Sequence, residues 1–177
     1  MDTELRHRIN AGRVAVQRQI GFFKAQFGAV PSEWKSDNTR VTFADFAISE
    51  KIGRDINQSF PDDPFCSEEA LPADEEVSLE KGYAWILDPI DGTNNYALGL
   101  PACGISLGLF RNGLPVYGFV YDHALDRLVE GGGGLGIQVQ GYKFNRQSQA
   151  LSPRASIIGM HFPIPRPLLR ELEPVLS

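Results

Sequence analysis

The sequence has 177 residues, 42% of them hydrophobic and 22% charged, which is the composition of an ordinary soluble globular protein with a real core. The formal net charge of −5 does not suggest a nucleic-acid surface, and no apolar run approaches the roughly 20 residues of a membrane span. The N-terminal residues are charged and no signal-like apolar segment follows them, so a cytoplasmic location is the default expectation.

Two amphipathic helices are predicted in the first 60 residues. Apolar residues recur at steps of three and four from Leu5 to Phe27, which predicts a long helix ended by a glycine and a proline. A second helix is predicted from Thr42, as its N-cap, to about Ser59. Asp45 lies in its first turn, where a carboxylate interacts favourably with the helix dipole. From the residues alone, simple capping and a functional role for Asp45 have even weight.

Strands are predicted through the rest of the chain. The apolar run Tyr83–Leu87 suits a strand that is buried on both faces. An Asn-Gly turn at 112–113 predicts a β-hairpin. The glycines at 131–134 lack the lysine and Ser/Thr of a phosphate loop and are interpreted as a flexible bend. Further strand patterns cover residues 65–67, 103–110, 115–121, 127–130 and 135–139.

Cysteine and histidine residues give weaker signals. Cys66 and Cys103 are far apart in a chain expected to be intracellular, which favours two reduced thiols over a disulfide or a metal pair. His7 lies outside the apolar stripe of its helix and is interpreted as a surface residue. His123 falls in a turn and is interpreted as structural or solvated. The acidic run 74–76 is interpreted as a solvated loop.

The stretch after Leu87 concentrates polar chemistry in a few residues. Asp88 and Asp91 are three positions apart, and two ionised carboxylates held together repel unless a cation lies between them. Magnesium fits because it takes hard oxygen ligands and fills its remaining positions with water and phosphate. Gly92 and Thr93 offer backbone N–H groups at the start of a short helix, where phosphate binds well. An ordinary polar turn is the alternative that composition alone leaves open.

The segment Trp85–Asn95, with the sequence WILDPIDGTNN, resembles the signature of the inositol monophosphatase family. The segments Val41–Asp45, Glu68–Glu69 and Gly104–Leu109 follow the order and approximate spacing of the same family. Members are magnesium-dependent phosphomonoesterases related to fructose-1,6-bisphosphatase. The resemblance covers the family's N-terminal half and implies an α+β fold, with two long N-terminal helices packed on a largely antiparallel sheet.

The resemblance also implies roles for individual residues. It makes Glu68, Asp88, Asp91 and the carbonyl of Ile90 ligands of Mg²⁺. It implies hydrolysis of a sugar or inositol monophosphate by a metal-activated water. The catalytic residues that it implies are Thr93, Asp45 and Glu68, with Asp45 orienting the threonine. The residues that it implies for substrate binding are Asp91, Gly92, Thr93 and Asn94.

Residues 1–155 are predicted to form the metal-binding domain and 156–177 to begin a second domain. In the family, a Trp-Asp motif of that second domain contributes a third aspartate, and this sequence has no equivalent. Two functions are therefore expected. The first is Mg²⁺-dependent phosphatase activity. The second is a catalytically impaired homologue that binds metal or phosphate, or serves as an assembly partner. The expected partners are a small phosphorylated substrate and further copies of the chain in a homo-oligomer, without nucleic acid or membrane.

Overall fold

The computed structural model describes residues 2–34, 40–69 and 81–144. The chain divides into two compact units, Met1–Phe144 and Asn145–Ser177, and the second unit lies entirely outside the described residues. The domain boundary expected at residue 155 and the acidic loop at 74–76 also lie outside them. Both stay predictions.

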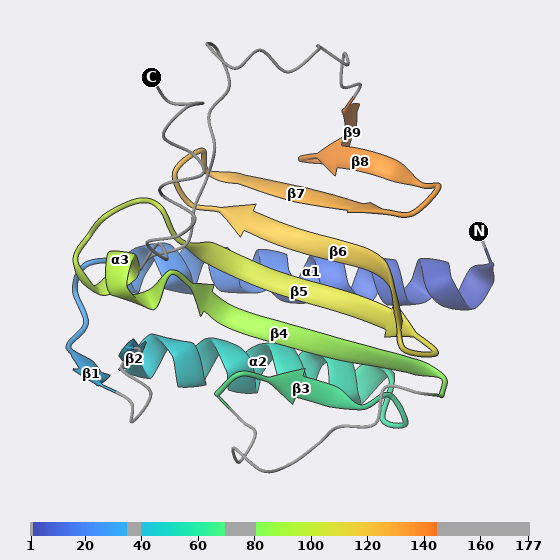
Figure 1. Cartoon of the computed structure of the whole chain (residues 1–177), viewed down its shortest axis with the longest axis horizontal. Helices are drawn as coiled ribbons and strands as arrows, with labels where there is room; N and C mark the ends of the chain where they lie inside the picture. The colour runs from blue at the N-terminus through green and yellow to red at the C-terminus, as the bar shows by residue number, and fades with distance from the viewer. Residues whose placement is uncertain (1, 35–39, 70–80, 145–177) are drawn as a thin grey trace, which may run out of the picture. The chain divides into compact units, whose positions relative to one another are not determined.

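A seven-stranded sheet forms the centre of the first unit, with strand order β3-β4-β5-β6-β7-β8-β9 (Figure 1). β3 and β4 are parallel, whereas the other five pairs of neighbours are antiparallel. The strands are β3 (Phe65–Ser67), β4 (Tyr83–Asp91), β5 (Gly104–Arg111), β6 (Leu114–Asp122), β7 (Arg127–Gly132), β8 (Gly136–Val139) and β9 (Tyr142–Phe144). A separate small sheet pairs β1 (Ser32–Trp34) with β2 (Arg40–Thr42).

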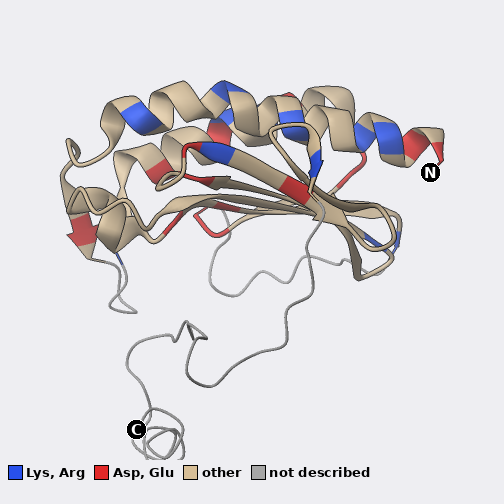
Figure 2. Ribbon diagram, turned by 90° about the horizontal axis from the view of Figure 1, so that it is seen from above, with Lys and Arg blue, Asp and Glu red and all other residues tan. Residues whose placement is uncertain are grey.

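Two long helices, α1 (Thr3–Gln26) and α2 (Phe43–Ser59), cover one face of the large sheet (Figure 2). A short helix, α3 (Thr93–Ala97), follows β4. The predicted α+β arrangement of two N-terminal helices on a largely antiparallel sheet is confirmed. Within the described part of the chain, no helix is long and apolar enough to cross a membrane.

The helix boundaries follow from their caps. The side chain of Asp2 accepts a hydrogen bond from Leu5 N at 2.7 Å and begins α1, and Gly28, with φ +67°, follows its end. Thr42 caps α2 as predicted, because its hydroxyl oxygen accepts a hydrogen bond from Ala44 N at 3.1 Å. The core then forms between these helices and the sheet, from Val16, Phe23, Ile48, Ile52, Ile56, Trp85, Leu87, Leu107, Phe119 and Tyr121.

β4 departs from its prediction in two ways. The expectation that it ends at Leu87 is wrong, because pairing with β5 continues to Asp91 with a register shift between Asp88 and Asp91. The expectation that both faces are buried is also wrong, since Ile86 is 36% exposed. Alternate side chains of a strand point to opposite faces, and the helices cover only one of them.

The turns of the sheet agree with the sequence. Asn112 and Gly113 have φ angles of 51° and 77°, and two positive angles are what a tight hairpin turn between β5 and β6 requires. The glycines at 131–134 span the end of β7 and the turn toward β8, as the bend interpretation predicts. His123 packs its ring 4.2 Å from the centroid of Phe27, so it is a structural residue.

An ion pair ties the start of α1 to the strands below it. Arg8 donates two hydrogen bonds to Asp63, at 2.8 and 2.9 Å, and its guanidinium lies 4.0 Å from the ring centroid of Tyr83. The indole N–H of Trp85 donates to the same carboxylate at 3.1 Å. A bidentate arginine–carboxylate pair with low exposure is one of the stronger polar contacts in proteins. It holds the beginning of β4 against α1.

Close approach of α1 to the sheet depends on Gly12. A Cβ at this position would lie 2.7 Å from a ring carbon of Phe119 and 2.8 Å from one of Trp85. Both rings are completely buried and cannot move without disturbing the core. Gly21, on the same helix, has no atom within 4 Å of the equivalent position.

We therefore expect Gly12→Ala to lower the free energy of unfolding by about 1–3 kcal/mol, because it overpacks the core. Gly21→Ala is the matched control and should raise it by about 0.5–1 kcal/mol, since alanine is the better helix former. Urea unfolding followed by circular dichroism measures both changes. Equal effects of the two substitutions would contradict the close packing at Gly12.

Candidate functional site

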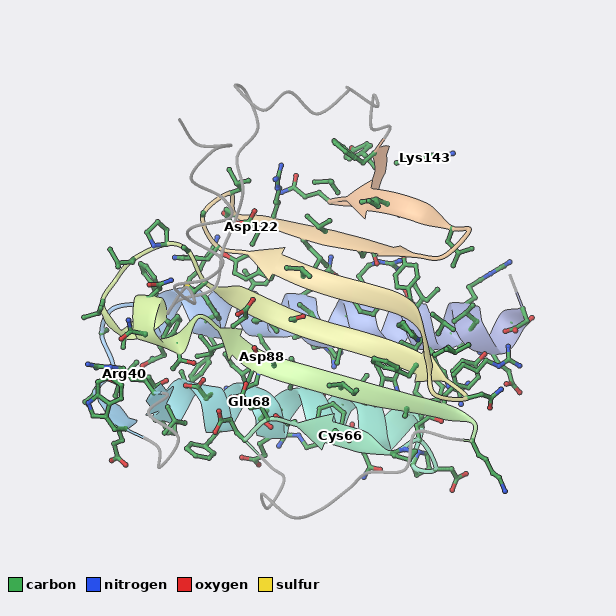
Figure 3. All side chains as sticks on the ribbon, in the orientation of Figure 1. Arg40, Cys66, Glu68, Asp88, Asp122 and Lys143 are labelled. Atoms are coloured by element: carbon green, nitrogen blue, oxygen red, sulfur yellow. The ribbon has the colours of Figure 1, made fainter. Side chains whose placement is uncertain are left out.

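The parallel pairing of β3 with β4 brings two acidic segments to one end of the sheet. Ser67 lies opposite Leu87, and the amide of Glu68 donates to the carbonyl oxygen of Leu87 at 3.1 Å. Because parallel strands end on the same side, Glu68 and Asp88 come together just past this pair, as Figure 3 shows. Glu68 is exposed and Asp88 is half-buried.

β4 presents its own carboxylates through an irregular end. Asp88 lies opposite Ser106 and Asp91 lies opposite Gly104, with the register shift between them. Pro89, which has no N–H to donate, lies within the irregular segment. The structure thus brings Glu68, Asp88 and Asp91 to the same end of the sheet, as the sequence predicts.

Asp88 experiences the strongest electrostatic perturbation of the site. Burial raises the pKa of its carboxyl to about 7, and the nearby carboxylates of Glu68 and Asp91 contribute to the same increase. A hydrogen bond from the backbone of Ile90 opposes it. At neutral pH the group is therefore divided between its protonated and ionised forms. Like charges raise a carboxyl pKa in this way when no cation lies between them.

Asp45 is a buried carboxylate that joins two elements. Its Oδ2 accepts hydrogen bonds from Thr42 N at 2.7 Å and from Thr42 Oγ1 at 2.6 Å, while Oδ1 lies 3.2 Å from Thr93 Oγ1. Burial raises the pKa of Asp45, and these hydrogen bonds oppose the increase. The carboxylate therefore caps α2 and contacts Thr93 at once, so the two roles considered for it are compatible.

The hydroxyl of Thr93 has two acceptors within reach. Its Oγ1 lies 2.9 Å from the carbonyl oxygen of Ile90 and 3.2 Å from Asp45 Oδ1. A hydroxyl carries one proton, so it donates to one of these oxygens at a time. In either orientation, its own lone pairs can accept a hydrogen bond from water or substrate.

Gly92 shapes the turn between β4 and α3. Its φ is +81°, and a Cβ there would lie 2.8 Å from the carbonyl oxygen of Ala102. Only glycine fits both the backbone angle and the space. Thr93 begins α3, and Asn94 next to it is exposed. The predicted short helix after the two aspartates is confirmed.

Two residues that hold this turn were not predicted from the sequence. The Tyr96 hydroxyl donates to the carbonyl of Phe23 at 2.8 Å, and the Tyr96 carbonyl accepts from Gly28 N at 3.0 Å. Asn95 Nδ2 donates to the carbonyl of Ala102 at 2.8 Å. Tyr96 is fully buried between aromatic rings, and its place beside the polar signature was the signal that could have identified it.

Both cysteines are free thiols, and one of them lies at the site. Burial raises the pKa of Cys103 to about 11, and the charge of Asp91 adds to this effect. A thiol with this pKa is protonated at neutral pH and is a poor nucleophile. Cys103 is therefore a packing residue beside the carboxylates.

The donor set fits a hard divalent cation. It consists of the carboxylates of Glu68, Asp88 and Asp91 and the carbonyl of Ile90, and oxygen donors of this kind suit Mg²⁺. Burial is the main cause of the raised pKa of Asp88, and the charges of Glu68 and Asp91 contribute to it, so these carboxyl groups are near enough to interact. Among the residues that the structure describes, no three His, Cys, Asp or Glu side chains converge closely enough to enclose a metal. The ligand assignment therefore stays a prediction.

The fold is an α+β domain, and one end of its sheet carries acidic residues and a threonine that contacts the carboxylate of Asp45. These features can be compared with those of known protein families. The sequence model of the inositol monophosphatase family matches residues 3–164. The chain belongs to the inositol monophosphatase family.

Two relatives show how much of a family member the chain represents. It is 36% identical to inositol monophosphatase 1 of Solanum lycopersicum over 110 residues, which are 62% of this chain and 40% of that protein. It is 30% identical to the fructose-1,6-bisphosphatase/inositol-1-monophosphatase of Aquifex aeolicus over 157 residues, 87% of this chain and 58% of that protein. The chain thus spans about half the length of the curated relatives it matches.

Solved structures agree with the fold. The IMPase of Thermotoga maritima superposes with a TM-score of 0.72 and 28% identity, over 81% of this chain and 55% of that one. An IMPase/NADP phosphatase complexed with Mg²⁺ and phosphate superposes with a TM-score of 0.65 and 27% identity, over 77% of this chain and 52% of that one. The similarity is to one half of each protein.

The burial of Asp88 and the charges of its neighbours predict a pH-dependent stability. The pKa of Asp88 is higher in the folded protein than its ordinary value of 3.8, so its stabilising contribution is present below pH 4 and is lost as the pH rises through about 7. In EDTA, Asp88→Asn should remove this loss and raise the melting temperature at pH 8 more than at pH 4. Thermal unfolding at both pH values measures the difference. A variant that melts below the parent at pH 8 would contradict it.

Proposed function

We propose that the chain is the metal-binding half of a Mg²⁺-dependent phosphatase that hydrolyses a sugar or inositol monophosphate. The observation that carries the proposal is the raised pKa of Asp88, which burial causes in the first place and which repulsion by the nearby Glu68 and Asp91 carboxylates increases further. A cation would relieve this repulsion. Family membership supports a phosphatase in general, and the neighbour complexed with Mg²⁺ and phosphate supports the metal.

The chain's own residues would each have a defined part. Glu68, Asp88, Asp91 and the carbonyl of Ile90 would hold the metal. When bound, Mg²⁺ stabilises negative charge on phosphoryl oxygens and acidifies water. The exposed Asp91 and Asn94, with the backbone N–H groups of Gly92 and Thr93, would bind the phosphate ester.

Thr93 and Asp45 would handle the proton. With its hydrogen directed at Asp45 Oδ1, the Thr93 hydroxyl exposes lone pairs that accept a hydrogen bond from the attacking water. The water then loses its proton to Thr93 as the hydroxyl proton moves toward Asp45. Burial raises the pKa of Asp45, which makes its carboxylate a better proton acceptor. Attack in line with the departing alcohol requires no covalent enzyme intermediate.

The proposal includes the partners and the location of the protein. We expect it to bind a small phosphorylated substrate, to form a homo-oligomer and to be located in the cytoplasm. Support for an assembly comes from Ile86, Val120 and Ile137, which are 36%, 45% and 45% exposed. A further chain could cover these apolar side chains.

The first test is phosphate release from inositol 1-phosphate. We expect turnover in Mg²⁺ and none in EDTA, and we expect Asp91→Asn to lower the rate by about 100-fold or more, since even outer partners of a metal ligand are worth 10- to 100-fold. Asp62→Asn, a change at an exposed turn residue, is the matched control and should keep the parent rate.

A contaminating phosphatase is the main alternative source of turnover. The double variant Asp45→Asn/Thr93→Ala, purified in parallel, should release no phosphate above background. Release at the parent rate from this variant, or from Asp91→Asn, would sink the assignment of these residues.

A second candidate function is binding without turnover, as a catalytically impaired homologue or assembly partner. Calorimetry of Mg²⁺ and inositol 1-phosphate binding separates the candidates. Binding of both ligands with no phosphate release identifies the second function, and absence of Mg²⁺ binding contradicts both.

A further inference from the structure

The helix-facing side of the sheet changes character along one row of paired residues. Leu87, Leu107 and Phe119 lie side by side on β4, β5 and β6 and are 1%, 1% and 0% exposed. The same row continues on β7 and β8 with Glu130 and Gln138. The helix-facing side of the sheet is therefore apolar on β4, β5 and β6 and polar along this row on β7 and β8.

The position of α1 explains the change. α1 packs against β5 and β6, while the sheet continues past the helix to β9 (Figure 1). On these outer strands Glu130 is buried but paired with Arg13 of α1, whereas Gln138 is partly exposed, so both polar side chains are stable there. The strands that extend past α1 and the side of the helix together form a groove.

The groove has a volume of about 420 Å³, which is enough for a small metabolite. Arg6, Asn10 and Arg13 are spaced by four and three residues, so they occupy one side of α1. The groove is lined by Arg6, His7, Ile9, Asn10, Arg13, Tyr117, Leu135 and Gln138. Polar groups of the helix and of β8 thus face each other across it.

The charges of the groove favour an anion. Glu130 is buried and its carboxylate is occupied by Arg13, whose Nε lies 2.7 and 3.0 Å from its two oxygens. Arg13 Nη1 also donates to Asn10 Oδ1 at 3.4 Å. Because the Arg13–Glu130 pair is neutral overall, the charge of Arg6 makes the groove positive. The whole chain, by contrast, has a net charge of −5.

We propose that this groove binds a small organic anion that combines a phosphate, phosphonate or carboxylate group with an apolar ring. The guanidinium of Arg6 pairs with the anionic group, and the side-chain amides of Asn10 and Gln138 donate hydrogen bonds to it. The ring lies on Tyr117 and Leu135, which supply apolar area beside the polar row. We call this the α1 groove.

The α1 groove is separate from the carboxylate site. Arg8, near the start of α1, contacts Tyr83 at the beginning of β4. Phe23, near the end of α1, contacts Tyr96 of α3, which follows the end of β4. α1 and β4 therefore run in the same direction. The groove lies along the first turns of the helix, at the opposite end from Asp88.

Phenylphosphonate is a suitable probe because it has both parts of the predicted ligand and no ester bond to hydrolyse. We would titrate it into the 177-residue chain in EDTA and follow amide signals by NMR. Saturable shifts should appear at the side-chain amides of Asn10 and Gln138, with a Kd on the order of 1 mM for a ligand of this size. Arg6→Glu should weaken binding by about tenfold or more, since it replaces an attraction with a repulsion.

Two control variants distinguish binding in the α1 groove from binding elsewhere on the protein. Arg54→Glu makes the same charge change at an exposed position of α2 and should leave the Kd unchanged. Asp88→Asn should also leave it unchanged, because the carboxylates take no part. The proposal is overturned by an absence of saturable shifts up to about 20-fold above the expected Kd, by equal weakening in Arg54→Glu, or by shifts confined to Gly92 and Thr93.

Discussion

The double pairing of β4 is the constraint on which the site depends. β4 is parallel to β3 on one side and antiparallel to β5 on the other, so its position is set from both edges. The parallel side brings Glu68 to the end where Asp88 emerges. The antiparallel side continues past Pro89 and carries Asp91 to the same end. Backbone hydrogen bonds thus hold together carboxylates that would otherwise separate, and their repulsion adds to the increase that burial causes in the pKa of Asp88.

Much of this could be predicted because the signals are local. The spacing of apolar residues from Leu5 to Phe27 identifies α1, and the chemistry of Thr42 identifies the start of α2. The Asn-Gly pair identifies the β5–β6 hairpin. The acidic signature after Leu87 identifies the site through resemblance, and the structure brings its residues to one end of the sheet. Each of these signals is a pattern of residues that are close together in the sequence.

The features that could not be predicted depend on distant partners. Ile86 lies in an apolar run, but its exposure is decided by the absence of a helix over that face in the described residues. The continuation of β4 to Asp91 is decided by β5, which begins 13 positions later along the chain at Gly104. Tyr96 adjoins the polar signature, but its partner is distant: its hydroxyl donates to the carbonyl of Phe23, 73 residues away. No local pattern records such contacts.

The two acceptors of Thr93 give the site an internal coupling. The hydroxyl proton goes either to the carbonyl of Ile90 or to Asp45 Oδ1. A cation held by the Ile90 carbonyl would withdraw electron density from that oxygen and make it the weaker acceptor. The hydroxyl proton of Thr93 would then favour Asp45, and the lone pairs of Thr93 would reorient with it. Under the proposed function, metal binding and the orientation of the Thr93 hydroxyl would therefore be coupled through one rotatable bond.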